Sequence, residues 1–559
     1  MGDTTATAEG RFRNIRVYWL AFIVYWGILL FGYDTGIGGG VVSAPYFLES
    51  FGLIENGVKD VKKSDEVSGN VVAVLQAGAF FGALSSAPVS SRLGRRNTLF
   101  AFTVIFTIGA ILTTVAAGPP HGLPLIYAGR VLGGYGIGAI SAVSPAYVSE
   151  CAPKEVRGRI TGLFQIMVSI GVMISYFVNF AIGLHVPTGV NVWRIPFGVQ
   201  LIPAGIMVLG LLTVKVRFTL ILVPLHTHRP LTSPSTIHYH QESPRWLASV
   251  GKDEQALKNL AYLRRAPIDS PAILEEFAEI QAAIQEEREA RAGLGLKEAF
   301  LGKGNFIRFV IAFVIFLLQQ WAGQNSINYY APQIFASIGF VARKNSLLAS
   351  GVYGIIKVVA TAIFIFFGVE TIGRKLSLLI SALGMGSLFF IIGAILKTHP
   401  PPSTNPNVAP PEPSAAAKGM AAMLYIYVCF YSIGWGPLPW VYVSDIFPTR
   451  TRHYGLATAS ASQWLWNFVI SKVTPQLLTA LGFKIFMMFG AINVGAMGLF
   501  SALIPETKGK SLEEMDIIFG SISAEERNEN IRKVQRERGE HVHEEGSEKT
   551  ESVTRKEVA

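Results

Sequence analysis

The chain has 559 residues, of which 50% are hydrophobic and only 15% are charged, whereas soluble proteins carry about 25% charged residues. The hydrophobic residues gather in runs of about 18 or more, which is the pattern of membrane-spanning helices. The formal net charge of +10 therefore reflects where basic residues lie relative to a membrane, and it does not indicate a nucleic-acid partner. Cys151 and Cys429 lie far apart, in or beside apolar runs, so we expect no disulfide framework.

The apolar runs predict an all-α membrane protein with twelve transmembrane helices. The first run continues as a span after Arg11, Arg13 and Arg16, without the short apolar region and cleavage site of a secretory signal, so we expect no cleaved leader. We expect the spans at about 18–40, 70–91, 98–118, 123–148, 159–184, 194–215, 306–336, 346–368, 376–397, 419–443, 453–477 and 483–504.

Basic residues indicate how these spans are oriented. They cluster in the loops that an even number of spans returns to one face, whereas opposite loops such as 119–122 and 185–192 carry none. Arg343 and Lys344 are an outnumbered exception. The positive-inside rule then places both termini in the cytoplasm, and we expect a multi-pass protein of the plasma membrane.

The two halves of the chain repeat one another. Gly94–Arg96 follows the second span, and Gly373–Lys375 follows the eighth. Ser149–Glu150, after the fourth span, lies 295 positions before Ser444–Asp445, after the tenth. Two six-span halves in parallel repeat place a substrate site at their interface, near the middle of the membrane.

The segment that ends the seventh apolar run is unusually polar. It carries three Gln and two Asn from Gln319 to Asn328, and an unpartnered amide in hydrocarbon costs roughly 2–7 kcal/mol. We therefore expect it to be buried among helices or to line a wet cavity, with a helix break near Gly323. Uncharged amides and the phenol of Tyr329 suit a neutral polyhydroxylated solute, because they exchange hydrogen bonds without a charge to desolvate. The alternative is that the amides hold helices together.

Linkers and tails complete the expected organisation. The charged stretch 253–291 has helical periodicity and predicts cytoplasmic helices, 398–418 is Pro-rich and predicts an external loop, and the charged tail predicts disorder. The expected parts are a cytoplasmic N-terminus at 1–17, a six-helix half at 18–215, an insertion at 216–241, a helical linker at 242–305, a second six-helix half at 306–504 and a largely disordered cytoplasmic tail at 505–559.

Short motifs follow one another along nearly the whole chain between about 18 and 516. They are Gly32–Gly36, Gly94–Arg96, Gly129–Arg130, Glu150 with Arg157, Glu242–Leu247, Gln319–Gln320, Tyr330–Pro332, Gly436–Trp440 and Pro505–Gly509. As a set they resemble the sugar porter family of the major facilitator superfamily, in the style of fungal monosaccharide transporters and quinate permeases. The resemblance implies the major facilitator fold, with cytoplasmic helices between its two halves.

The segment 216–241 departs from that family's pattern. It holds four His, three Pro and no periodicity within its 26 residues, a length that is short, as fungal introns are. Codons for Lys–Val–Arg and His–Gln can carry splice signals, so we interpret the segment as an intron retained in frame. Removing it joins Lys215 to Glu242 and restores the expected motif. The alternative is a genuine cytoplasmic insertion.

The resemblance also implies which residues contact the solute. Their chemistry agrees, since amides fix hydroxyl groups and an indole offers an apolar face with one N–H donor. For Trp440 alone, simple packing is the alternative, although the glycines and prolines from Gly434 to Pro439 would let its helix bend. The implied contacts are Gln165, Gln319, Gln320, Asn325, Trp440 and Gln463, with Tyr329 and Asn467 as further candidates.

Charged residues on the cytoplasmic side resemble the inner salt-bridge network of the same family. Pairs under the two halves could lock them together when the site faces outward and separate when it faces inward. The alternative is that these residues serve only the positive-inside topology. The expected gate residues are Arg92, Arg95, Glu150, Arg157, Glu242, Arg374, Asp445, Arg450, Arg452 and Glu506.

Two opposite charges stand inside apolar spans of the first half. Asp34 lies in the first span and Arg130 in the fourth, where each ionised side chain costs about 2.5–3.5 kcal/mol on insertion scales. We expect them to pair and to bind the coupling proton, as the Asp of proton symporters does by resemblance. The alternative is a permanent ion pair that only orients two helices.

The leading hypothesis is therefore a transporter that imports a monosaccharide, with hexoses first, by proton symport through alternating access. A quinate or polyol permease is the alternative, but a carboxylate needs a cation, and Arg130 is the one buried candidate that the pattern offers. A sugar sensor is disfavoured, because only 43 residues follow Asp516. We expect no enzyme, cofactor or metal, and the expected partners are the solute, protons and the bilayer, in a monomer without nucleic acid.

Overall fold

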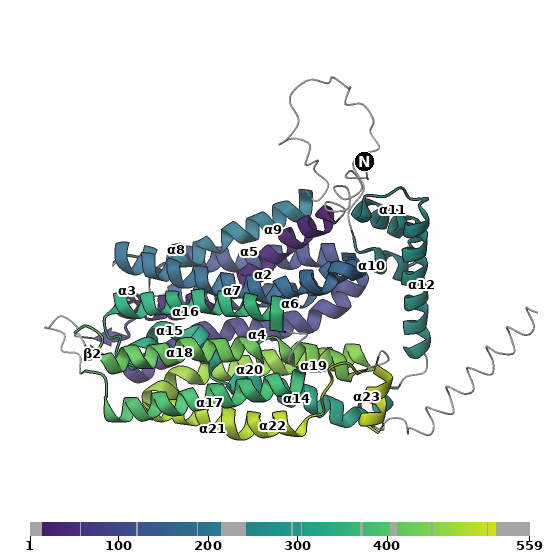
Figure 1. Cartoon of the computed structure of the whole chain (residues 1–559). Coiled ribbons are helices and arrows are strands. Elements are labelled where there is room, and N and C mark those ends of the chain that lie inside the picture. The colour runs from purple at the N-terminus through teal and green to yellow at the C-terminus, as the bar shows by residue number, and fades with distance from the viewer. Residues whose placement is uncertain are drawn as a thin grey trace, which may run out of the picture.

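The structure is a computed structural model that describes residues 14–55, 58–118, 121–186, 188–213, 242–291, 295–302, 304–368, 373–402, 411–448, 451–510 and 512–520. The expected insertion, most of the expected tail and Arg450 lie outside these residues, as does the side chain of Arg157. Long helices run along one common axis (Figure 1). We call the end that carries α10–α12 the linker end and the opposite end, which carries α3 and the β1–β2 hairpin, the hairpin end.

The first half is a bundle of long helices that begins at the linker end. The sixth expected span is a pair of helices, α8 and α9, and a short connection at the hairpin end holds two strands that pair Ile54 with Lys59. The elements are α2 Ile15–Val42, α3 Pro45–Ser50, β1 Ile54–Glu55, β2 Val58–Lys59, α4 Val61–Leu93, α5 Arg95–Val115, α6 Gly122–Cys151, α7 Lys154–His185, α8 Asn191–Val199 and α9 Leu201–Thr213.

The linker helices and the second half follow. Four helices lie in the segment where a helical linker was expected, namely α10 Pro244–Ser249, α11 Asp253–Arg264, α12 Pro271–Arg291 and α13 Leu296–Leu301. The second half contains α14 Asn305–Trp321, α15 Gln324–Ser337, α16 Arg343–Ile363, η3 Phe364–Gly368, α17 Arg374–Thr398, α18 Ala415–Ile433, α19 Leu438–Ile446, α20 Arg452–Leu481, α21 Lys484–Ala491, η4 Ile492–Met497, α22 Gly498–Leu503 and α23 Leu512–Ile518.

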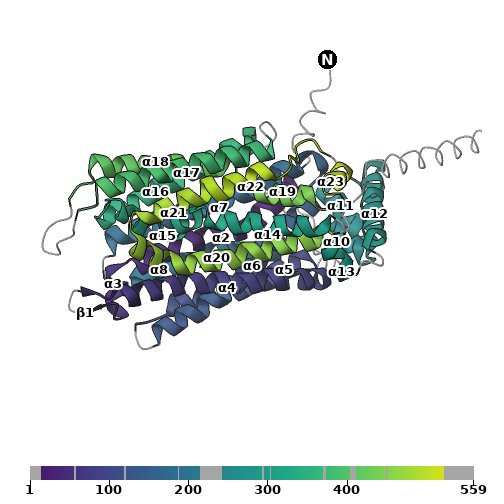
Figure 2. The ribbon, with the colours of Figure 1, turned by 90° about the horizontal axis from the view of Figure 1, so that it is seen from below.

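Eleven helices or helix pairs among the described residues are long and apolar enough to cross a membrane. The remaining expected span, at 453–477, is α20, a helix of 30 residues that is too polar for this criterion. Its polar residues can lie between helices rather than in lipid, because α20 packs against α4 of the first half and α14 of the second, as Figure 2 shows. The expectation of twelve spanning helices in two halves therefore agrees with the fold.

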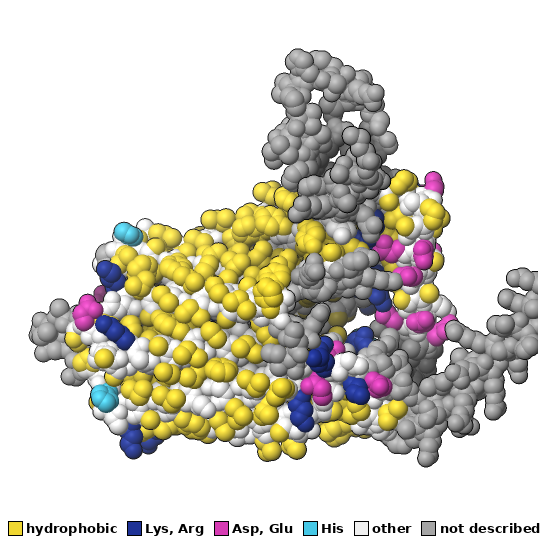
Figure 3. All heavy atoms as spheres, in the orientation of Figure 1, with side chains coloured by type: hydrophobic (Ala, Val, Ile, Leu, Met, Phe, Trp, Pro, Cys, Tyr) yellow, Lys and Arg dark blue, Asp and Glu magenta, His cyan; other side chains and the backbone are white. Residues whose placement is uncertain are grey.

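The surface between the two ends is apolar. Hydrophobic side chains cover the flank of the bundle, whereas charged side chains gather at its ends (Figure 3). Phe367 and Leu503 are each 75% exposed, a fraction that suits contact with lipid. This distribution is what a bundle needs in order to lie in a bilayer along the axis of its helices.

Helices α4 and α18 begin before their predicted spans, and a capping side chain explains each start. Helix α4 begins at Val61 rather than near 70, because the Asp60 side chain accepts the backbone N–H of Lys63 at 3.0 Å. Helix α18 begins at Ala415, because Ser414 accepts the N–H of Ala417 at 3.1 Å. The prediction of a loop through 418 was therefore wrong for its last four residues.

Candidate solute-binding site

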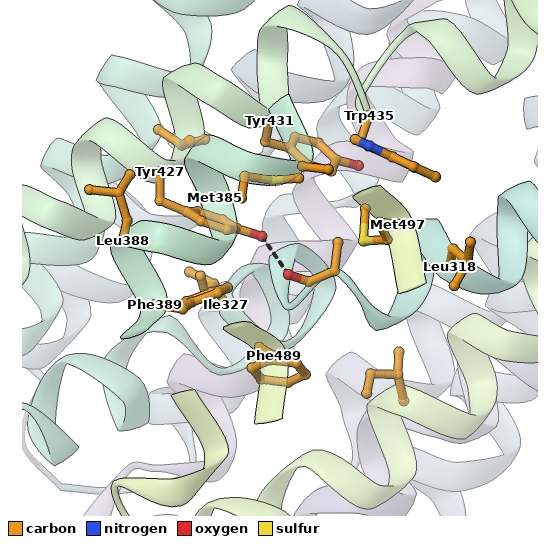
Figure 4. Packing of buried hydrophobic residues seen from close by; sticks show 14 of the residues in the cluster. Leu318, Ile327, Met385, Leu388, Phe389, Tyr427, Tyr431, Trp435, Phe489 and Met497 are labelled. Carbon is orange, nitrogen blue, oxygen red and sulfur yellow. Dashed lines mark hydrogen bonds between the residues drawn. The ribbon is translucent and has the colours of Figure 1, made fainter. Parts of the chain in front are cut away.

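The expected break in the seventh span lies between α14 and α15, at Ala322 and Gly323. Gly323 has a φ of +95°, and an added Cβ would lie 2.9 Å from the Phe389 ring. The freed carbonyl of Ala322 accepts from the Tyr427 hydroxyl at 2.9 Å and from the Asn493 amide at 3.0 Å. Figure 4 shows Tyr427 and Phe389 in the packed core around this break. Because both groups donate to this carbonyl, the helix can end there without leaving a buried acceptor unsatisfied.

All eight expected solute contacts line one cavity between the two halves. The space between its lining atoms is about 830 Å³, a volume that includes open solvent at its mouth. Phe31, Thr35 and Phe164 of the first half also line it. The eight are Gln165, Gln319, Gln320, Asn325, Tyr329, Trp440, Gln463 and Asn467.

The amides of the second half form one hydrogen-bonded network. Asn325 donates to Gln320 Oε1 and, at 3.4 Å, to Asn467 Oδ1. Asn467 in turn donates to the Tyr329 hydroxyl at 2.9 Å. A network of this kind fixes the direction in which each amide presents its oxygen and nitrogen, so the wall of the cavity is preorganised for hydroxyl groups.

Gln319 has a structural task as well as a place in the wall. Its amide nitrogen donates to the carbonyl oxygens of Trp435 and Gly436 at 2.7 and 3.2 Å. These carbonyls lie where α18 ends and α19 has not yet begun, at the bend that the glycines and prolines predict. Trp440, just beyond the bend, packs its ring 4.5 Å from that of Phe316 and keeps part of its surface exposed to the cavity.

Lys357 of α16 also lines this cavity, and the sequence pattern did not single it out. Its side chain is 3% exposed, and its ammonium group donates to Asn328 Oδ1 at 3.1 Å. The available signal was a lone Lys within an apolar span, where a charge costs about 2.5–3.5 kcal/mol on insertion scales and marks function. The prediction that Arg130 is the one buried cation available to a carboxylate was therefore wrong.

Asp34 and Arg130 pair as expected, and both are buried, at 1% and 2% exposure. Gln200 of α8–α9 joins them, since its amide donates to the same Asp34 Oδ1 at 3.0 Å. Arg130 also donates from Nε to the carbonyl oxygen of Val71 at 3.0 Å. Oδ2 of Asp34 has no hydrogen-bond partner among the described residues. The pair thus leaves one carboxylate oxygen available.

At the linker end of the first half, the expected charges bind one another and the linker. Arg95 pairs with Glu150 at 3.0 Å, and the Ser243 hydroxyl donates to the same carboxylate at 2.5 Å. Glu242 accepts the backbone N–H groups of Arg95 and Arg96, at 2.8 and 3.1 Å. Burial raises the pKa of the Glu242 carboxyl in spite of these donors. The linker is therefore attached to the first half.

Two further contacts strengthen that attachment. Trp246 donates from its indole to the Ser91 carbonyl at 2.9 Å, and Arg264 donates to the Cys151 carbonyl at 2.9 Å. Arg92, which was expected in the gate, is exposed at this end. Helices α10 and α11 therefore pack against the first half.

The second half repeats the arrangement with other residues. Arg374 lies 3.4 Å from Asp445, and the Thr507 hydroxyl donates to the same carboxylate at 3.0 Å. Glu506 accepts the backbone N–H groups of Arg374 and Lys375, both at 3.0 Å, as Glu242 does at α5. Arg452 donates to the Phe447 carbonyl at 3.3 Å. Each of these contacts lies within the second half, and none of them joins the halves.

The two halves meet mainly toward the hairpin end, where α2 packs on α15, α4 on α20 and α7 on α16. Tyr176 of the first half donates to the Asn328 carbonyl at 2.8 Å, and Gln333 of the second donates to the Gly39 carbonyl at 3.0 Å. The cavity is therefore sealed from the hairpin end by contacts between halves.

Comparison with known proteins identifies the family to which this chain belongs. The family model "Sugar (and other) transporter" matches residues 20–222 and 231–519. The "Probable quinate permease" of Neosartorya fischeri is 35% identical over 514 residues, which cover 91% of this chain and 88% of the relative. The chain belongs to the sugar transporter family of the major facilitator superfamily. The "Quinate permease" of Emericella nidulans is 34% identical over 512 residues, which cover 90% of this chain and 89% of the relative.

Solved structures of this superfamily agree with the fold of the transporter. The xylose transporter XylE from E. coli, in a partially occluded inward-open conformation, matches with a TM-score of 0.69 and 26% identity over 89% of this chain and 99% of that one. The proton:xylose symporter XylE bound to 6-bromo-6-deoxy-D-glucose matches with a TM-score of 0.69 and 27% identity over 90% and 99%. The family consists of membrane transporters, so the chain is a multi-pass membrane protein that carries a solute.

Proposed function

We propose that this transporter imports a polyhydroxylated ring solute, a monosaccharide or quinate, by proton symport through alternating access in the plasma membrane. The observation that carries the proposal is the cavity between the halves, lined by uncharged amides and an indole. Hydroxyl groups exchange hydrogen bonds with such amides, and the ring C–H groups of the solute can lie on the indole face of Trp440. XylE supports a monosaccharide by its name, and the fungal relatives support quinate by theirs.

The orientation that we propose places the linker end in the cytoplasm, as the positive-inside rule requires. The seal at the hairpin end is then external, and the described state has its site turned away from the outside. Among the described residues, the ion pairs Arg95–Glu150 and Arg374–Asp445 each lie within one half in this state. In the opposite state we expect the same charges to bring the halves together and close the cytoplasmic side.

The proposed driving force is a proton that binds Asp34. The unpartnered Oδ2 can accept a proton without the loss of a hydrogen bond. Protonation would remove the attraction that holds Arg130 to Asp34, and Arg130 could then strengthen other contacts. This change in the first half would alter the balance between the two states of the transporter.

Uptake by a yeast strain that lacks its own hexose and quinate transporters tests the proposal. The strain would express the full chain or the chain without 216–241, each fused to a fluorescent protein that reports its arrival at the plasma membrane. Glucose, xylose, myo-inositol and quinate would be offered at external pH 5 and 7, with and without a protonophore. We expect acid-stimulated accumulation of at least one solute. Absence of uptake for all four, with either chain present at the surface, would refute the proposed function.

A further inference from the structure

Lys357 is a buried cation inside the solute cavity. It lies in α16 between Tyr353, which faces the seventh span, and Thr361, which contacts Ser432. Its 3% exposure shows that the side chain does not extend to an aqueous surface. Its position in the wall of the cavity means that a bound solute would lie within its reach.

The ammonium group differs in its partners from two other buried cations, Arg130 and Arg264. Arg130 pairs with Asp34, and Arg264 pairs with Glu276 at 2.6 Å. Within the described ranges, Lys357 has no carboxylate within ion-pair distance, and Asn328 is the acceptor that it contacts. A buried charge is normally paired with an opposite charge because removing it from water is costly. A cation in the cavity wall whose acceptor is a neutral amide therefore points to an anion brought by the ligand.

The surroundings hold Asn328, and through it the ammonium, in a fixed position. Gln324 donates to Asn328 Oδ1 at 2.8 Å, and Gln324 Oε1 accepts from the Tyr353 hydroxyl at 2.9 Å. Oδ1 of Asn328 thus accepts hydrogen bonds from both Gln324 and Lys357. An ammonium has three N–H donors, so two remain after the bond to Asn328.

We infer that Lys357 binds a carboxylate on the transported solute, and that the substrate is a polyhydroxylated ring acid rather than a neutral sugar. The inference rests on the proposed function and narrows its substrate class. The carboxylate would lie at the α15–α16 side of the cavity, where it receives charge-assisted hydrogen bonds from the ammonium. The ring hydroxyls would then lie against Gln320 and Asn325, and the C–H face against Trp440.

The test compares quinate with quinamide, which keeps the ring hydroxyls but has no charge. Binding would be measured on the purified full chain, for the unaltered protein, Lys357→Met, Lys357→Arg and the control Lys397→Met, which removes an exposed Lys at the hairpin end. We expect the unaltered protein and the control to prefer quinate over quinamide by at least about tenfold. Lys357→Met should lose roughly ten- to a hundredfold in quinate affinity and keep its quinamide affinity, while Lys357→Arg keeps part of the preference.

The outcomes separate this inference from the proposed function. Binding of quinamide by Lys357→Met would show that this variant is folded. If Lys357→Met does not reach the membrane, a preserved preference of Lys357→Arg for quinate over quinamide supports the inference instead. An unaltered protein that accumulates glucose or inositol and ignores quinate would overturn the inference and leave the proposed function standing. Equal losses for quinate and quinamide in Lys357→Met would also overturn it, because they would assign Lys357 a purely structural role.

Discussion

Asn467 of the second half donates a hydrogen bond to Oε1 of Gln76 in the first half, across 3.3 Å. The same amide nitrogen donates to the Tyr329 hydroxyl at 2.9 Å, and Asn467 lines the cavity. The Asn467 side chain therefore lines the cavity, belongs to the amide network of the second half and contacts the first half. A solute that draws Asn467 toward itself would weaken the contact between the halves, which is one way for binding to affect the seal at the hairpin end.

Gln76→Ala should favour opening at the hairpin end. Gln76 is 1% exposed, and the loss of one buried hydrogen bond costs about 1 kcal/mol, which changes the ratio of two states about fivefold. Spin labels at Lys62 and Lys418, both exposed at the hairpin end of different halves, would report the distance between the halves. A distance distribution identical to that of the unaltered protein would show that this contact does not contribute to the seal.

Gln320→Ala and Asn325→Ala should sharply reduce uptake while surface expression persists. Each removes about 1–3 kcal/mol of hydrogen bonding in a dry site, or roughly ten- to a hundredfold in affinity. Transport kinetics at the plasma membrane would measure the change. Gln285→Ala, which alters an exposed amide on α12, is the matched control. Unaltered kinetics in both cavity variants would remove these residues from the site.

Asp34→Asn should abolish accumulation but keep downhill exchange, because a neutral amide resembles the protonated acid. Counterflow of labelled solute in vesicles would measure exchange, and net uptake with and without a protonophore would measure accumulation. Asp253→Asn, at an exposed position in the first turn of α11, controls for the loss of a carboxylate. Accumulation by Asp34→Asn that still collapses with a protonophore would mean that the coupling proton binds elsewhere.

Glu150→Gln should trap the transporter in one orientation rather than abolish binding. The change removes the anion that joins Arg95 to Ser243 of the linker, and alternating access depends on the relative stability of two states. Net uptake should fall several-fold while solute binding in membranes remains, with Glu286→Gln on the exposed side of α12 as the control. Loss of binding together with uptake would instead point to misfolding.

Glu506→Gln should lower the thermal stability of the purified protein at neutral pH. Partial burial raises the pKa of this carboxyl, but the backbone N–H groups of Lys508, Arg374, Lys375 and Thr507 outweigh burial and hold the pKa below its ordinary value of 4.5. The ionised form therefore contributes stability above that value and loses it as the pH falls through the lower, folded-state pKa.

The difference in melting temperature between the unaltered protein and Glu506→Gln should thus be present at pH 7 and shrink as the pH is lowered below about 4.5. Glu412→Gln, at an exposed position near the hairpin end, provides the comparison. A difference that stays constant down to acid pH would mean that the charge of Glu506 plays no part in capping α17.

The residues that line the cavity were largely predictable because their chemistry is unusual for a membrane span. Amides such as Gln320 and Asn325 have no stable place in lipid, so their presence alone requires a cavity or a helix interface. The breaks beside Gly323 and before Trp440 were predictable for a related reason, since glycine and proline interrupt a helix at known positions.

Single polar residues were harder to interpret. Lys357, Gln200 and Gln76 each stand alone in an apolar span, and what they do depends on which helix faces them. That pairing is set by the packing of helices distant in sequence, such as α4 with α20, and no periodicity within one helix encodes it. Glu242 and Glu506 were predicted as members of a salt-bridge network, but both carboxylates accept hydrogen bonds from backbone N–H groups.

The attachment of the linker to the first half has a practical consequence. Glu242, Trp246 and Arg264 hold α10 and α11 through their own contacts with α5, α4 and α6, and none of these depends on the peptide that leads from Thr213 to Glu242. We therefore expect the chain to tolerate a change of length between these two residues. A reporter domain or an affinity handle placed there would leave the helices on both sides in register.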